Sequence, residues 1–129
     1  MNSAEYRTLR EACGMTARDA AAFHGVAERT IVHWESARNG IPDGAAEELM
    51  RLNARIDRAV LEAVDLYTDL HAKHGETDAV NLFRYRTAED YARCRAAGEG
   101  LAHACHNALI GRMMTALARI GARVVIAWG

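Results

Sequence analysis

Hydrophobic and polar residues follow a helical period along most of the chain, and the pattern changes near Gly75. Before that glycine, apolar residues recur at spacings of three and four, which is typical of helices that bury one face. After it, two short apolar runs rich in β-prone residues appear beside further helical segments. The sequence therefore predicts a mainly α protein that ends in a small C-terminal α/β unit with two strands.

Short helices are expected over residues 3–13, 16–24 and 27–37. Ser3 and Thr16 are the expected N-caps of the first two, because a side-chain oxygen at this position binds a free backbone N–H of the first turn. A tight Gly-containing turn separates the second helix from the third. Such an arrangement is typical of a helix-turn-helix, here within an N-terminal head of four to five helices.

A long helix is expected over residues 43–74, and it carries an apolar heptad repeat. Such a seam indicates either a long amphipathic helix packed on its own domain or a helix that also pairs with a partner chain. The second interpretation makes the chain a homodimer. The residues predicted to contact the partner then lie along this seam and in the last apolar run: Leu49, Leu52, Ile56, Leu66, Leu70, Val124, Ile126 and Trp128.

Beyond residue 75, strands are expected over 79–86 and 123–128, with helices over 87–97 and 101–120. A two-stranded sheet of this size can scarcely cover both of its faces alone. Packing on the long helix or on a second copy would supply the missing cover.

The domain organisation expected from these elements has three parts. Residues 1–42 form a helix-turn-helix head, residues 43–75 a connecting and dimerisation helix, and residues 76–129 the C-terminal α/β dimerisation unit.

The net charge of −1 is uninformative, but its distribution is uneven. Residues 1–40 hold five Arg and five acids, residues 41–78 have a balance of −5, and residues 79–129 have a balance of +4. The acidic and basic parts either complement one another, within one fold or across a dimer, or form ordinary solvated faces.

The composition also bears on the compartment. The chain starts without an apolar leader and has no apolar run near the roughly 20 residues that span a bilayer. Cys13, Cys94 and Cys105 show no C-x-x-C spacing and are expected to be free thiols. A cytoplasmic protein without a membrane partner is expected.

A set of residues between positions 9 and 36 resembles the helix-turn-helix of the repressor/Cro family. Ala21 is small where two helices approach closely, Gly25 supplies the turn, and Val26 and Ile31 fill the core. The full set is Leu9-Arg10-Glu11-Ala12-Cys13-Gly14-Met15-Thr16, Ala21, Gly25-Val26, Thr30-Ile31 and Trp34-Glu35-Ser36.

The stretch WESAR, the long helix and the later HNALIGR also resemble a narrower group, the anti-CRISPR-associated repressors of phages and plasmids. That resemblance spans nearly the whole chain and is weaker after Gly40. It implies a head that binds DNA and a C-terminal domain that dimerises. Ala27 departs from the pattern, because the family usually has Ser or Thr as the cap of the recognition helix.

The resemblance makes residues 27–37 the recognition helix, whose N-terminal residues read bases. Because Val26, Ile31 and Trp34 face inward, the other side chains of this helix are left outward or near its N-terminal rim, and Val32 is a further candidate for that outward set. Arg29 suits guanine and Glu28 suits the amino group of cytosine. The predicted base-reading residues are Glu28, Arg29, Thr30 and His33.

Phosphate contacts are expected from the start of the second helix, where free backbone N–H groups and the helix dipole attract anions. The resemblance also implies an ion pair between Arg10 and Glu35, which could present the arginine to a phosphate. The predicted phosphate-binding residues are Thr16, Ala17, Arg18, Ser36, Arg38, Asn39 and Arg10.

The function that follows is an autoregulatory transcriptional repressor that binds an inverted-repeat operator in double-stranded DNA as a homodimer. One alternative is a regulator that also binds RNA through a basic and aromatic C-terminal region, and another is an antitoxin that neutralises a partner protein. The RNA alternative depends on Arg84, Arg86, Arg93 and Arg95 near Phe83, Tyr85 and Tyr91.

Other chemistry has little support in the sequence. The chain has no phosphate-binding Gly-rich loop, no G-x-S-x-G and no H-E-x-x-H, so no enzymatic activity is expected. His71-x-x-His74 and His103-x-Cys105-His106 have spacings that zinc sites use, but helix-end and packing roles explain them better. No metal and no cofactor are expected.

Overall fold

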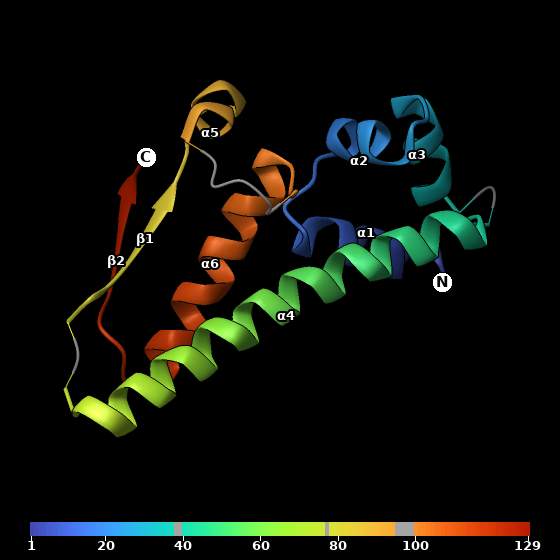
Figure 1. Cartoon of the computed structure of the whole chain (residues 1–129). Coiled ribbons are helices and arrows are strands. Elements are labelled where there is room, and N and C mark those ends of the chain that lie inside the picture. Colours follow the sequence, from blue (N-terminus) through green and yellow to red (C-terminus); the bar gives the residue numbers. More distant parts are fainter. Residues whose placement is uncertain (38–39, 77, 95–99) are drawn as a thin grey trace. The chain divides into compact units, whose positions relative to one another are not determined.

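A computed structural model describes residues 1–37, 40–76, 78–94 and 100–129 (Figure 1). These residues form six helices and a small C-terminal sheet of two strands, which confirms the predicted fold class. Within them, no helix is both long and apolar enough to cross a membrane. The elements are α1 (Ser3–Ala12), α2 (Ala17–His24), α3 (Glu28–Glu35), α4 (Asp43–His74), β1 (Val80–Arg84), α5 (Ala88–Cys94), α6 (His103–Arg119) and β2 (Val124–Trp128).

The chain divides into two compact units, Met1–Ile56 and Asp57–Gly129, and the division falls inside α4. The first unit contains α1, α2, α3 and the beginning of α4. The second contains the remainder of α4, both strands and the last two helices. Each unit has buried side chains of its own.

Side chains cap the first two helices. The N-cap of α1 is Asn2 rather than the predicted Ser3: its side chain accepts from the backbone N–H of Glu5, and the Glu5 carboxylate accepts from the N–H of Asn2. Both residue types make good caps, so the sequence could place the cap only to within one position. Thr16 caps α2 as predicted, in a reciprocal capping box with Asp19.

A tight turn joins α2 to α3. Gly25 adopts a left-handed conformation with φ 70°, which glycine reaches without steric cost. The third helix then starts after Ala27, which provides no side-chain cap. It ends at Glu35 instead of the predicted residue 37, because Ala37 has φ 63° and cannot continue a right-handed helix.

The core of the first unit joins all three short helices to the start of α4. Tyr6 and Ile31 are fully buried, and Trp34 is nearly so. From α4, Leu49, Leu52 and Ile56 are also buried in the single chain. The prediction that these three contact a partner therefore has to be corrected, since their part of the seam already packs in the chain's own core.

The later part of the seam is different. Leu66 and Leu70 lie one turn apart on α4 and are exposed. In the second unit, Asp57 near the middle of α4 forms an ion pair with Arg112 of α6. Of the five predicted seam residues on α4, Leu66 and Leu70 are the two that the chain itself does not bury.

The two strands of the second unit are parallel, with Val80 beside Val124 and Arg84 beside Trp128. The connection between them contains α5 and α6, as a parallel pair requires. The backbone N–H of Asp90 binds the side chain of Thr87 at the start of α5, and the predicted end of this helix near residue 97 lies outside the described residues. Contacts from α6 cover part of the sheet.

The outer edges of the two strands differ. On β1, the side chain of His106 donates to the carbonyl of Phe83 (3.0 Å), while Asn107 binds both the N–H and the carbonyl of Tyr85 (3.2 and 3.0 Å). These bonds also end β1 at Arg84, two residues before the predicted end. His103 adds a second contact to the carbonyl of Tyr85, at 2.6 Å.

On β2, the backbone N–H and carbonyl groups of Val124, Ile126 and Trp128 point away from β1. This follows from the register of the strands and from two bonds, Val80 N–H to the Arg123 carbonyl and Gly129 N–H to the Arg84 carbonyl. In the described part of the chain, no side chain or backbone group binds the outward N–H or carbonyl groups of these three residues. Among the described residues, the edge of β1 is thus guarded at its C-terminal end, whereas the edge of β2 is open.

Candidate nucleic-acid interface

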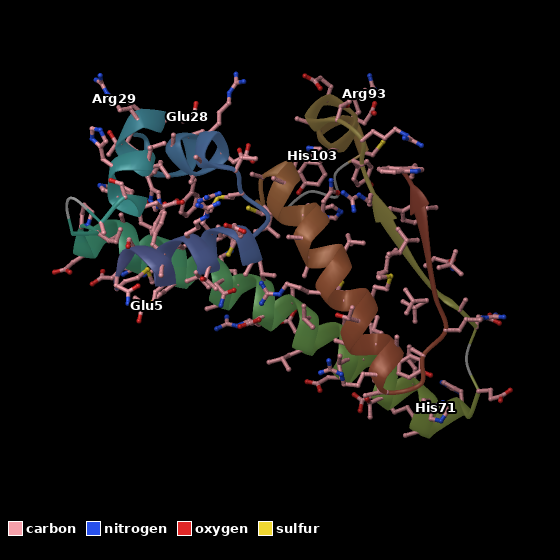
Figure 2. The ribbon with its side chains drawn as sticks, turned by 180° about the vertical axis from the view of Figure 1, so that it is seen from behind. Glu5, Glu28, Arg29, His71, Arg93 and His103 are labelled. Carbon is pink, nitrogen blue, oxygen red and sulfur yellow. The ribbon has the colours of Figure 1, made fainter. Side chains whose placement is uncertain are left out.

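One face of α3 is exposed and polar. Glu28, Arg29 and His33 are all exposed, whereas Ile31 and Trp34 point into the core. Figure 2 shows Glu28 and Arg29 projecting away from the helices of the first unit. Three of the four predicted base-reading residues are thus brought together on one surface.

The fourth, Thr30, is less accessible. It is partly covered, and it lies on the flank of α3 between the exposed face and the buried one. Its backbone N–H donates to the carbonyl of Ala27 (2.9 Å), in the first turn of the helix. Val32, which the sequence offered as a further outward residue, is 54% exposed and lies beside Arg29 on this face.

The predicted phosphate site at the start of α2 is partly occupied. The N–H of Thr16 donates to the Asp19 carboxylate at 2.9 Å, so it is already bound. Ala17 and Arg18 follow in the first turn, where N–H groups have no partner within a helix. Arg18 is exposed and adds a positive side chain at this end.

The residues after α3 supply one further predicted contact within the described part of the chain. Ser36 is exposed, and its hydroxyl donates to the carbonyl of His33 at 2.9 Å. The hydroxyl oxygen keeps lone pairs for another donor, but its proton is engaged. Arg38 and Asn39 lie outside the described residues.

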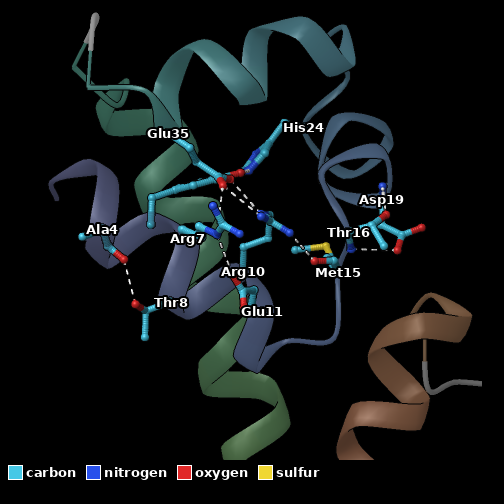
Figure 3. Close-up of polar contacts among 11 residues, drawn as sticks. Ala4, Arg7, Thr8, Arg10, Glu11, Met15, Thr16, Asp19, His24 and Glu35 are labelled. Carbon is cyan, nitrogen blue, oxygen red and sulfur yellow. Dashed lines mark hydrogen bonds and ion pairs between the residues drawn. The ribbon is translucent and has the colours of Figure 1, made fainter.

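The structure brings Arg10 and Glu35 together in a two-pronged ion pair (Figure 3). The Nε of Arg10 lies 2.7 Å from one Glu35 oxygen and its Nη2 lies 2.9 Å from the other. The remaining nitrogen, Nη1, donates to the carbonyl of Met15 at 2.7 Å. The hydrogen bond to Glu35 raises the pKa of the guanidinium above its ordinary value, and α1 is tied to both α3 and the turn before α2.

This arrangement changes the role expected for Arg10. The residue is only 7% exposed and all three of its nitrogens bind partners inside the unit. It therefore does not reach a phosphate in this conformation, and its role is to position α3. The neighbouring Arg7 is exposed, 3.9 Å from Glu35, and its bond to Glu11 lowers the pKa of that carboxyl.

A buried aromatic cluster lies under α3, and sequence reasoning missed part of it. The Nε2 of His24 lies 2.8 Å from the hydroxyl of Tyr6, and the rings of both pack at 5.5 and 5.7 Å from Trp34. Burial, followed by the charge of Glu35, raises the pKa of Tyr6 to about 12. No spacing rule marks a histidine at the end of α2 as a core residue.

The other ring nitrogen of His24 faces α4. It is buried, and it lies 3.5 Å from the Glu48 carboxylate without a hydrogen bond of good geometry. Burial lowers the pKa of His24, and Glu48 opposes that shift. The neutral imidazole is therefore the form that this site favours.

In the second unit, the basic and aromatic residues separate into two groups. Tyr91 is buried and Tyr85 half-buried, with Tyr91 packed 4.9 Å from the ring of His106. By contrast, the guanidinium groups of Arg84 and Arg86 lie 5.5 and 4.0 Å from the ring of the exposed Trp128.

The remaining residues of the RNA alternative have other roles. Phe83 is exposed, Arg93 pairs with Asp90, and Arg95 lies outside the described residues. Within the described ranges, no three His, Cys, Asp or Glu side chains form a group that could hold a metal ion.

These features define a mainly helical protein in which an ion-paired three-helix segment presents one exposed polar helix face. The chain belongs to the Aca2/YdiL-like family, whose family model matches residues 1–118. This membership agrees with the resemblance to anti-CRISPR-associated regulators seen in the sequence. A search of curated proteins found no match.

Proposed function

We propose that this protein is a sequence-specific DNA-binding repressor, acting as a phage- or plasmid-associated regulator of its own operon. The observation that carries the proposal is the exposed face of α3, held on a scaffold that fixes its orientation. A recognition helix must be rigid and must present its N-terminal side chains to the major groove. The turn at Gly25 and the Arg10–Glu35 pair supply the rigidity, and Glu28 and Arg29 supply the side chains.

The chemistry of this face suits base edges. Arg29 has the paired donors that match the two acceptors of guanine, and Glu28 can accept from the amino group of cytosine. His33, one turn after Arg29, reaches a further base edge or a phosphate. The first turn of α2, with Ala17 and Arg18, supports backbone binding beside it. Membership of the Aca2/YdiL-like family supports a regulator of this kind.

Two exposed features support a homodimer. The open outer edge of β2 presents backbone groups that a second β2 strand, running antiparallel, can pair with. Leu66 and Leu70 add an exposed apolar strip on α4. Two identical heads related by a two-fold axis would bind an inverted repeat.

The decisive experiment is a selection of DNA fragments with the full-length chain, followed by affinity measurements on the selected sequence. Arg29→Ala should weaken binding by about 1–3 kcal/mol and relax the preference at one base position. Arg51→Ala is the matched control, because it removes the same charge from an exposed site on α4. Equal affinities and equal preferences for the wild type and the Arg29→Ala variant would contradict the assignment of α3 as the reading helix.

A second candidate function is RNA binding beside DNA binding. It is favoured by the exposed stack of Arg84 and Arg86 on Trp128, since guanidinium planes and aromatic rings both stack on unpaired bases. Trp128→Ala should weaken binding of single-stranded RNA and leave duplex DNA binding intact. If no single-stranded RNA competes with duplex DNA or binds alone, this candidate is wrong.

A further inference from the structure

Val32 lies within the exposed face of α3 and is the one apolar residue on it. Glu28 lies one turn before it and Ser36 one turn after it, and Arg29 and His33 lie beside it on the same exposed face. Its side chain is 54% exposed, whereas the core contacts of α3 are made by Ile31 and Trp34. Valine is also a poor choice for an exposed helix position, because its branched Cβ restricts rotamers. Packing within the first unit therefore does not account for this residue.

The major groove offers one apolar group that a small branched side chain can contact. That group is the C5-methyl of thymine, while the other base-edge features there are hydrogen-bond donors and acceptors. Resting on the DNA-binding function proposed above, we propose that Val32 reads a thymine methyl group in each half of the operator. Arg29 would supply the polar part of the recognition and Val32 the apolar part.

The helix geometry also limits where that thymine lies. Arg29 and Val32 are three residues apart, so their Cβ atoms are separated by about 5–6 Å. Successive base pairs are about 3.4 Å apart along the duplex. The thymine read by Val32 therefore lies within about two base pairs of the guanine read by Arg29.

The test removes the methyl group alone. In the operator recovered by selection, each thymine is replaced in turn by deoxyuridine, and the affinity of the full-length protein is measured by fluorescence anisotropy. One replacement per half-site should weaken wild-type binding by about fourfold, the contribution of one buried methyl group. That position should lie within about two base pairs of the one at which Arg29→Ala relaxes the preference.

Val32→Ala should bind the unmodified operator more weakly and lose its sensitivity to deoxyuridine at that position. Alanine favours helix more than valine does, so this variant should fold. Met50→Ala is the matched control: it shortens another exposed apolar side chain of the first unit and should keep the full deoxyuridine effect.

The outcomes separate this inference from the proposed function. Tight DNA binding that no deoxyuridine weakens would overturn the role of Val32 and leave the repressor proposal standing. A Val32→Ala variant that keeps the deoxyuridine effect would assign the methyl contact to another residue. Failure of the selection to recover any DNA would overturn the repressor proposal, and this inference with it.

Discussion

The Arg10–Glu35 pair converts two charged side chains into a structural clamp. Both side chains are about nine-tenths buried, so each charge has lost most of its water and depends on the other. A buried ion pair of this kind adds little net stability over an apolar pair, but losing one partner leaves a buried charge uncompensated. The clamp therefore controls the placement of α3 on α1 more than the overall free energy of folding.

Glu35→Gln should lower the free energy of unfolding by about 3 kcal/mol, because Arg10 keeps its charge and loses its counter-charge. Thermal or denaturant unfolding of the full chain measures this, and DNA affinity should fall with it as α3 loses its orientation. Glu11→Gln is the control, since its exposed pair with Arg7 should contribute almost nothing. Equal unfolding midpoints for Glu35→Gln and wild type would show that the pair does not hold α1 and α3 together.

The buried His24 should make stability depend on pH. Its pKa in the folded state is lowered, so the native protein binds fewer protons at this site than the unfolded chain does. The contribution of neutral His24 to the free energy of unfolding is complete above the ordinary histidine pKa of about 6.5. This contribution is lost as the pH falls below that value toward the pKa of His24 in the folded state.

The predicted pH dependence can be tested by measuring the free energy of unfolding between about pH 7.5 and about pH 5. This range spans the ordinary histidine pKa of about 6.5. The decline toward low pH should be smaller in His24→Gln, which can still bond to the hydroxyl of Tyr6. His33→Gln is the matched control, because it removes an exposed histidine and should keep the wild-type slope. Identical slopes in all three proteins would show that His24 is free to take up a proton in the folded state.

At the scale of elements, the chain just after α3 contains an alanine in a backbone conformation that usually needs glycine. Ala37 has φ 63°, which costs a residue with a Cβ atom about 1–2 kcal/mol. Ala37→Gly should therefore stabilise the protein by up to about 1 kcal/mol, after the greater flexibility of glycine in the unfolded chain is counted.

The same substitution inside a helix provides the control. Ala22 is exposed in the middle of α2, and Ala22→Gly should destabilise by about 1 kcal/mol. Opposite shifts of the melting temperature in the two variants are expected. A loss of stability in Ala37→Gly would mean that this residue does not adopt a left-handed conformation in solution.

Local rules predicted the elements that depend on local chemistry. The bounds of α4 follow from Asp43 and Gly75, and the start of α2 follows from the capping box of Thr16. The premature end of α3 could not be predicted, because alanine gives no signal for a left-handed residue. The end of β1 was missed for another reason: Asn107, far along the chain, takes the backbone groups of Tyr85.

At the scale of the whole molecule, the heptad seam shows what periodicity leaves undecided. An apolar repeat predicts that one face of the helix is buried, but it does not indicate whether the same chain or a partner chain buries it. Leu49 is covered by the chain itself, whereas Leu66 and Leu70 are exposed. The exposure of Arg29 on α3 was predicted better. Once Ile31 and Trp34 point into the core, the helix geometry turns Arg29 toward the solvent.

The proposed dimer can be tested at the sheet edge. Ile126→Pro removes an outward-facing N–H of β2 and should shift the protein from dimer toward monomer, as measured by analytical ultracentrifugation. Phe83→Pro is the matched control, because it removes an outward N–H from the other edge of the sheet. A dimer of unchanged stability in Ile126→Pro would show that the copies do not join through β2.

The guarded edge of β1 has a consequence for the size of any assembly. A sheet with two open edges can add strands in both directions, which leads to fibres with no natural end. Here the side chains of His103, His106 and Asn107 bind the Phe83 carbonyl and both backbone groups of Tyr85, at the C-terminal end of the β1 edge. In the proposed dimer, in which two copies pair through β2, the outer edges left over would be the two β1 edges, and these bonds oppose the addition of a further strand at the end of each. We therefore expect the proposed dimer to resist growth into longer assemblies, because three polar residues of α6 already bind part of the edge that a further strand would need.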